Sequence, residues 1–247
     1  MLFRSGGITT VSAGAALSVN GNLAINLDLI NDGTLTVNGT LVAGTGVNAF
    51  TNNGLIKGTG TINLTAPLAA LGRQLLNNGT VAPGASPGKL TILGDYVQTA
   101  LGTLSIELAG TVQGVNYDWL AVSGNAILDG ALAVAVPGGF TPTTADLFRF
   151  VTAGLTRSGT FTSVVPPAGY GGAAIYGAAF TDLGFTAIPA PTNTAADTIV
   201  TASLPVVLAE LSRNIDGALT RTTTTTPTQR TRRPDEETGD APVMVCQ

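Results

Sequence analysis

Histidine is absent from the 247-residue sequence, which removes the side chain that most often serves as a catalytic base or a metal ligand. Neither a Ser-His-Asp nor a Cys-His arrangement can form without it. The single cysteine, Cys246, cannot form a disulfide within the chain, and is either an incidental thiol or a bridge to another chain. We therefore expect no catalytic residues, no cofactor and no metal site, and a protein that is not an enzyme.

Charged residues are also scarce, at 11% of the chain against about 25% in ordinary globular proteins. The only lysines are Lys57 and Lys89, and the net charge is −4. Because no basic face can form, we expect no nucleic-acid partner. No run approaches twenty apolar residues, so we expect no transmembrane segment. Thr, Ser and Asn fill the polar positions, which is typical of secreted β proteins and of proteins that pack against their own copies.

A repeat occupies the first ninety residues of this glycine-rich chain. It consists of an apolar residue, Asn or Asp followed by Gly, and alternating β-forming residues. Copies read Ile30-Asn-Asp-Gly-Thr-Leu-Thr-Val, Thr51-Asn-Asn-Gly-Leu-Ile-Lys-Gly and Leu76-Asn-Asn-Gly-Thr-Val-Ala-Pro. The glycines Gly33, Gly54 and Gly79 are 21 and 25 residues apart. One such unit cannot bury its apolar face alone, so the repeat predicts stacked coils around a continuous core.

The repeat also predicts how each coil is built. The Asn-Gly and Asp-Gly pairs are expected to supply positive-φ corners between strands. Period-two alternation places Leu35 and Val37 inward and Thr34 and Thr36 outward. Asparagines at equivalent corners are expected to stack into a ladder, as amides do in cross-β arrays. An antiparallel hairpin is the alternative interpretation of Asn-Gly, and the regular long spacing favours the coil.

Four segments are expected along the chain. Residues 1–91 form the solenoid repeats, and residues 92–188 alternate strictly with turns about ten residues apart, which predicts a β-rich cap. Residues 189–219 form a linker and a short helix, and residues 220–247 a disordered Thr-rich charged tail. The predicted fold class is all-β: a parallel β-solenoid (β-helix) capped by a β-meander or sandwich-like region, with a short C-terminal helix and a disordered tail.

Two motifs in the middle of the chain carry a family resemblance. The first runs Gly79-Thr-Val-Ala-Pro-Gly-Ala-Ser-Pro-Gly-Lys-Leu-Thr-Ile-Leu-Gly-Asp-Tyr, and the second comprises Gly102-Thr-Leu-Ser-Ile-Glu-Leu and Tyr117-Asp-Trp-Leu-Ala-Val-Ser-Gly. Residues 30–164 resemble the C-terminal end of β-helical passengers of autotransporters and filamentous-haemagglutinin-like bacterial surface proteins. The resemblance implies that the first motif closes the solenoid and that the second belongs to a cap that assists passenger folding. It also implies an extracellular or bacterial cell-surface location.

A few residues remain as candidates for chemistry. The carboxylates Asp95, Glu107, Asp118 and Asp129 lie in the expected cap, and two of them at glycosidase separation could cleave sugars. Turn or solvent-face positions are the favoured interpretation for all four. A sugar lyase would also need a basic residue near its acids, which leaves only Lys57 and Lys89. Ser123 precedes a glycine, but no Gly-x-Ser-x-Gly elbow occurs.

Two binding alternatives stay open. Asp32 and neighbouring Asn oxygens are hard ligands that suit calcium, although no Gly-Gly-x-Gly-x-Asp repeat is present. Tyr117 and Trp119 could stack on a glycan, whereas the alternation favours packing of Trp119 against the cap core.

We therefore expect an extracellular structural or adhesive surface protein that is non-catalytic and self-assembles into filaments or matrix through strand edges. The alternative is a carbohydrate-binding or carbohydrate-active β-helix, and a bacteriophage fibre is a third. The expected partners are copies of the chain, neighbouring modules of a longer surface protein, and a host or glycan ligand.

Overall fold

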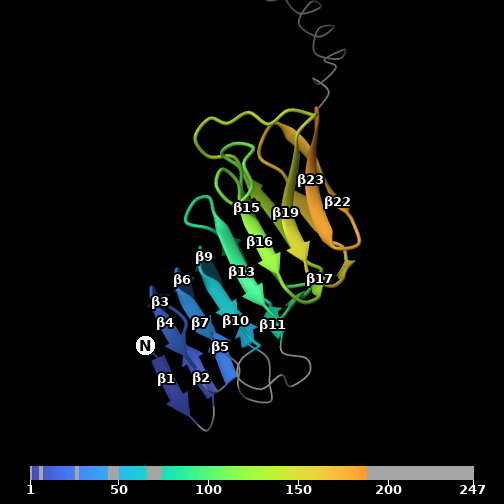
Figure 1. The fold of residues 1–247 in the computed structure, drawn as a ribbon. Helices are drawn as coiled ribbons and strands as arrows, with labels where there is room; N and C mark the ends of the chain where they lie inside the picture. The colour runs from blue at the N-terminus through green and yellow to red at the C-terminus, as the bar shows by residue number, and fades with distance from the viewer. Residues whose placement is uncertain (1, 6–7, 26–27, 44–49, 66–73, 188–247) are drawn as a thin grey trace, which may run out of the picture. The chain divides into compact units, whose positions relative to one another are not determined.

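Every regular element that the structure describes is a β-strand (Figure 1). The computed structural model describes residues 2–5, 8–25, 28–43, 50–65 and 74–187. These belong to the first of two units, Met1–Ile188, and the second unit, Pro189–Gln247, lies outside the described residues. The helix expected within 189–219 and the tail expected at 220–247 therefore lie there as well. No helix that could cross a membrane occurs in the described ranges.

The strands form three sheets, which we call A, B and C. Sheet A consists of β1 (Leu2–Ser5), β2 (Ile8–Val11), β5 (Asp28–Asn31), β8 (Phe50–Asn52), β11 (Gln74–Asn77), β14 (Asp95–Gln98), β17 (Ala126–Leu128) and β20 (Arg157–Gly159). Sheet B consists of β3 (Ala16–Val19), β6 (Thr34–Val37), β9 (Leu55–Gly58), β12 (Thr80–Pro83), β15 (Thr103–Glu107), β18 (Ala131–Ala135) and β21 (Ser163–Val165). Sheet C consists of β4 (Asn22–Ala24), β7 (Thr40–Val42), β10 (Thr61–Asn63), β13 (Lys89–Leu93), β16 (Trp119–Val122), β19 (Leu147–Ala153), β23 (Phe180–Ala187) and β22 (Tyr170–Tyr176).

Each coil of the chain contributes one strand to each sheet. Strands β5, β6 and β7 form one coil, and β8, β9 and β10 form the next. Hydrogen-bonded neighbours in sheet B are accordingly three strands apart in the chain, and they pair in parallel. This geometry confirms the predicted all-β parallel solenoid.

Apolar side chains form continuous columns through the interior. One column in sheet B consists of Leu35, Ile56, Val81, Leu104 and Leu132, which are paired in register from coil to coil. All five are fully buried, as is Val37, while Thr34 and Thr36 are partly exposed, as the alternation predicts. Each fully buried side chain of this kind stabilises the fold by about 1.5–3 kcal/mol relative to exposure.

The repeated glycines serve a different purpose from the one expected. Gly33, Gly54 and Gly79 are not among the residues with positive φ, so the predicted positive-φ corners are wrong at these positions. A Cβ atom at Gly54 would instead overlap the carbonyl oxygen of Gly33, and one at Gly79 would overlap that of Gly54. Glycine is therefore required because successive coils, stacked at about 4.8 Å, leave no room for a side chain at this corner.

A ladder of buried amides joins the coils at the end of sheet A. Asn31 Nδ2 donates to Asn52 Oδ1 at 2.7 Å, and Asn52 Nδ2 donates to Asn77 Oδ1 at 2.7 Å. All three side chains are fully buried. Asn52 Nδ2 also donates to the Thr80 carbonyl at 3.1 Å, so this amide is hydrogen-bonded to the backbone of the next coil as well as to its side chain. The predicted asparagine ladder is confirmed.

The ladder continues beyond the asparagines with different chemistry. Asn77 Nδ2 donates to the Tyr96 hydroxyl at 3.2 Å, and that hydroxyl donates to Gln98 Oε1 at 2.8 Å. Gln98 Nε2 then donates to the carbonyls of Asp129 and Ala131 at 2.6 and 3.0 Å. Burial raises the pKa of Tyr96 above its ordinary range, which keeps the hydroxyl neutral and able to donate.

A second ladder runs on the outside, one residue further along each coil. Asn53 Nδ2 donates to Asp32 Oδ1 at 2.8 Å, and Asn78 Nδ2 donates to Asn53 Oδ1 at 3.0 Å. Asp32 and Asn53 are exposed to solvent, so these bonds compete with water.

The parallel coils continue past residue 91. Strands β14 to β21 stack in parallel on the coils before them. Paired positions recur 21 residues apart at Ile30 and Thr51, but 30 residues apart at Val97 and Ile127. The longer coils carry loops between their strands, and these loops conceal the period and give the irregular turn spacing typical of a meander.

The antiparallel cap is consequently shorter than the predicted 92–188. It consists of β23, which pairs antiparallel with both β19 and β22 at one end of the solenoid (Figure 1). Aromatic edge-to-face contacts fill the space beneath it: the Phe148 ring centroid lies 5.2 Å from that of Tyr117 and 5.9 Å from that of Phe185.

The buried ladder predicts a large stability difference between two adjacent asparagines. Asn52→Ala removes four hydrogen bonds of the Asn52 side chain, including those to Asn31 and Asn77, and leaves the buried Asn77 Oδ1 without its donor. We expect a loss of about 2–4 kcal/mol in the free energy of unfolding. Asn53→Ala, the matched control in the exposed ladder, should lose under about 1 kcal/mol. Urea unfolding followed by circular dichroism measures both, and equal losses would contradict the role given to the buried ladder.

Candidate functional site: a groove over sheet B

The outward face of sheet B carries a groove of about 420 Å³. Its floor is formed by outward side chains at equivalent positions of neighbouring strands: Thr36 on β6 pairs with Lys57 on β9, and Lys57 pairs with Ala82 on β12. Ser105 on β15 extends this row. The segment 83–86 forms one wall, and Glu107 and Asp118 lie at the far end.

Two glycines fix the wall to the neighbouring coil. Gly58 N–H donates to the Gly84 carbonyl at 3.0 Å, and Gly84 N–H donates to the Gly58 carbonyl at 2.9 Å. Their φ angles are +118° and +100°, values that side chains with a Cβ rarely adopt. The Pro-Gly-Ala-Ser-Pro-Gly sequence therefore leaves the sheet here and forms a wall that these two hydrogen bonds hold against β9.

Asp118 fastens the far side of the same wall. Its Oδ1 accepts a hydrogen bond from the Gly88 N–H at 2.7 Å, and its Oδ2 accepts one from the Glu107 N–H at 2.8 Å. One carboxylate thus joins the loop after β12 to the end of β15. Asp118 acts on the groove by positioning its wall.

The carboxyl of Asp118 is buried, which corrects the expectation of a turn or solvent-face residue. Burial raises its pKa to about 7, and the nearby Glu107 charge adds to the rise, while the two backbone N–H donors lower it. The alternating pattern predicted a strand at Trp119 and Leu120. It could not predict that Asp118, just before this strand, would be covered by a loop from another coil.

The groove contains the two charged side chains for which the described residues provide no partner. Lys89 lies over the Trp119 ring at 4.2 Å, Arg149 forms an ion pair with Asp182 at 2.9 Å, and Arg157 donates to the Gly177 carbonyl at 2.8 Å. Every described Asp accepts a hydrogen bond or has another partner. Among the charged side chains that the structure describes, Lys57, Lys89 and Glu107 form no hydrogen bond or ion pair. Lys89 packs on Trp119, whereas Lys57 and Glu107 have no such contact and line the groove.

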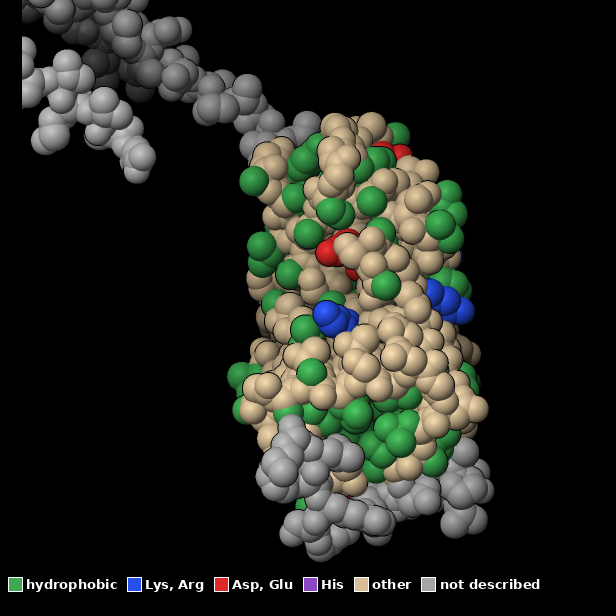
Figure 2. Space-filling model, turned by 90° about the vertical axis from the view of Figure 1, so that its left-hand side faces the viewer, with side chains coloured by type: hydrophobic (Ala, Val, Ile, Leu, Met, Phe, Trp, Pro, Cys, Tyr) green, Lys and Arg blue, Asp and Glu red, His purple; other side chains and the backbone are tan. Residues whose placement is uncertain are grey.

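The surface around such charges is nearly neutral. On the face shown in Figure 2, basic and acidic side chains lie close together in the middle of a surface made mostly of uncharged atoms. Ser105 and Thr36 place hydroxyls in the groove, and Ser86 adds one from the wall. The groove can therefore offer hydrogen-bond donors and acceptors together with one charge of each sign.

The remaining candidate carboxylates are separate from the groove. Asp95 Oδ1 accepts the Asn125 N–H at 2.6 Å, and Asp129 Oδ1 accepts the Gly130 N–H at 2.7 Å, so both stabilise turns as expected. Ser123 Oγ accepts the Gly94 N–H at 2.9 Å. Of the four predicted carboxylates, the structure brings together only Glu107 and Asp118, and it places Lys57 rather than Lys89 with them.

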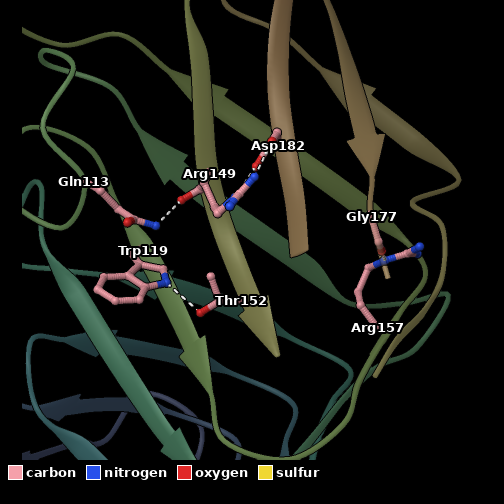
Figure 3. A network of polar contacts seen from close by, with 7 residues as sticks. All are labelled: Gln113, Trp119, Arg149, Thr152, Arg157, Gly177 and Asp182. Carbon is pink, nitrogen blue, oxygen red and sulfur yellow. Dashed lines mark hydrogen bonds and ion pairs between the residues drawn. The ribbon is translucent and has the colours of Figure 1, made fainter. Parts of the chain in front are cut away.

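Trp119 and Tyr117 do not form a joint stacking platform. Tyr117 is buried against Phe148, whereas Trp119 points outward from sheet C and is half-buried. Its indole N–H donates to Thr152 Oγ1 at 2.9 Å, within the polar network of Figure 3. Lys89 covers one face of the ring, and Gly114 approaches the ring closely. Trp119 was expected to pack against the cap core. It lies instead on the outer face of sheet C, partly covered by Lys89.

The same network closes the outer side of sheet C. Gln113 Nε2 donates to the Arg149 carbonyl at 2.6 Å, and the Arg149 guanidinium meets the Asp182 carboxylate (Figure 3). The guanidinium also lies 3.7 Å from the centroid of the Phe180 ring. These contacts bind a loop and the cap to the coils.

Calcium finds little support in the geometry. The Asp32 carboxylate accepts the Asn53 amide of the outer ladder, and no group of three or more His, Cys, Asp or Glu side chains that could hold a metal occurs in the described part of the chain. Cys246 lies outside the described residues.

Comparison with known proteins gives no family assignment. No family model matches the sequence. No curated protein is significantly similar to it either.

Sequence reasoning missed the hydroxyl and wall residues of the groove. Ser86 and Gly84 belong to a motif that was interpreted as a solenoid-closing signal alone. The motif itself was the available signal, since a Pro- and Gly-rich insertion between two strands of a coil must project over a sheet face.

The buried Asp118 predicts a dependence of stability on pH. Its folded-state pKa of about 7 lies above the value of about 3.9 for an unfolded Asp, so the folded chain binds a proton that the unfolded chain releases. The stability from this group is present below about pH 4 and lost as the pH rises through about 7. We expect a decrease of about 2–4 kcal/mol in the free energy of unfolding across that window. Urea titrations at several pH values should show it, and Asp118→Asn should flatten the curve; an unchanged slope in the variant would assign the effect to other groups.

Proposed function

We propose that this chain is a non-catalytic structural or adhesive segment of a bacterial surface protein, located outside the cell. The support is a solenoid whose outward faces carry mainly hydroxyl, amide and small side chains, together with an uncharged strand at a sheet edge. Such faces suit contact with copies of the chain, with neighbouring modules and with host surfaces. The resemblance of residues 30–164 to autotransporter and filamentous-haemagglutinin-like passengers supports the same proposal.

The edge strand β22 carries the self-assembly part of the proposal. It has seven residues, Tyr-Gly-Gly-Ala-Ala-Ile-Tyr, and is the longest strand at an edge of the three sheets as the structure describes them. It pairs with β23 on one side only. It contains no charge and no proline, the devices with which natural edge strands prevent pairing. Ala173 is exposed, and Ile175 is 48% exposed. A strand from another copy could therefore extend sheet C and build filaments or matrix.

Saccharide binding is a second candidate function, and one observation favours it. The groove over sheet B presents Lys57, Glu107 and three hydroxyls, and no described residue forms a side-chain hydrogen bond or ion pair with them. Binding is better supported than hydrolysis, because both oxygens of Asp118 already accept backbone hydrogen bonds and only Glu107 remains as a free carboxylate.

Self-assembly is tested by electron microscopy of the purified protein over a range of concentrations. We expect filaments or sheets whose amount rises with concentration. Ala173→Lys places a charge on β22, and we expect at least a tenfold loss of assembled material with unchanged circular dichroism.

Thr91→Lys on β13, a central strand of the same sheet, is the matched control and should assemble like the wild type. Monomeric protein at every concentration would refute self-assembly. Equal loss in both variants would show that added charge, and not the β22 edge, is responsible.

A further inference from the structure

The unpaired charges in the groove point to the chemical class of its ligand. The chain has few charged residues, and the structure provides a partner for each described charged side chain except Lys57 and Glu107. Their position in one groove gives that groove a defined polarity along the solenoid. The inference below rests on the saccharide-binding candidate and does not depend on self-assembly.

Lys57 and Glu107 do not pair with each other, since the ion pair found among the described residues joins Arg149 and Asp182. They lie on β9 and β15, which are separated by β12. Two strand spacings separate their backbones by roughly 10 Å. Ala82 lies between them and leaves the floor open. A single extended ligand can therefore contact both charges at once.

The groove is held in place before any ligand arrives. The Gly58–Gly84 hydrogen bonds fix the wall on one side and the Asp118 carboxylate fixes it on the other. A ligand therefore does not need to order the loop, which lowers the entropic cost of binding.

The groups that the groove offers favour a saccharide over a peptide. The floor strands are fully paired in sheet B on both sides, so no backbone edge is available for strand addition. The described lining holds no aromatic residue and no large apolar side chain, so it provides no pocket for a peptide side chain. Hydroxyls with one donor charge and one acceptor charge match a hydroxyl-rich chain.

We propose that the groove binds an acidic oligosaccharide, with a sugar carboxylate on Lys57 Nζ and sugar hydroxyls donating to the Glu107 carboxylate. The lysine selects the anionic group through a charge-assisted hydrogen bond. The hydroxyls of Ser105 and Ser86 complete the contacts from the floor and the wall.

The test is isothermal titration of the full chain with a uronic-acid oligosaccharide, oligogalacturonate, and with its methyl ester, which has the same hydroxyls and no charge. We expect the acid to bind at least tenfold more tightly than the ester. Lys57→Gln should weaken binding of the acid at least tenfold, and Glu107→Gln about threefold or more. Lys89→Gln, the other lysine, should leave binding unchanged. Lys57 is exposed and neither side chain has a partner, so the variants should fold like the wild type, as thermal unfolding will show.

Several results would overturn this inference. Equal binding of acid and ester with no effect of Lys57→Gln would leave the saccharide-binding function standing and remove its acidic specificity. Absence of binding to either saccharide would reject both the function and the inference. Tighter binding to an oligoglutamate peptide than to the oligosaccharide would assign the groove to acidic peptides instead. Stronger binding in Glu107→Gln would show that Glu107 repels the ligand and accepts no hydroxyl from it.

Discussion

The architecture depends on the requirement that each coil satisfy the buried polar groups of the next. Asn52 and Asn77 meet it with one donor and one acceptor each, and Asn31 meets it with its donor, at the same corner of successive coils. An unpaired amide in the core would cost about 1–3 kcal/mol, so the coils can stack in one vertical register only. That register aligns the apolar columns and brings the coils so close at Gly54 that no Cβ fits. The packing of the core and the choice of glycine thus follow from the ladder.

The ends of the asparagine ladder show how strict this requirement is. Val11 occupies the position paired with Asn31 in the preceding coil and cannot donate, and the buried Asn31 Oδ1 accordingly has no hydrogen-bond partner among the described residues. In the other direction the coils lengthen, and Tyr96 with Gln98 replaces a single amide. The longer Gln98 side chain reaches two carbonyls of the next coil, a span that an asparagine could not cover.

The same features decided what could be predicted from the sequence. Coils of nearly constant length place Asn-Gly at a constant spacing, so the solenoid, the inward columns and the ladder were predictable. Beyond Pro83 the loops change the spacing, and alternation alone cannot distinguish a parallel coil from a meander, because strands in both alternate with period two. The burial of Asp118 was not predicted for a related reason. The loop that covers it lies some thirty residues earlier in the chain, and the local sequence pattern carries no information about that contact. The wall residue Ser86 was missed in the same way.

The groove is a consequence of the stacking as well. Residues 83–88 interrupt a coil without breaking its register, because β12 and β13 still pair with the strands on both sides. A solenoid tolerates an insertion at a corner, since the core needs only the strands, and the inserted segment then lies over the neighbouring face. The other described charged side chains all have partners. Lys57 and Glu107 have none, so their charges contribute no pairing energy to the stability of the fold. Their position is better explained by contact with a ligand than by stability.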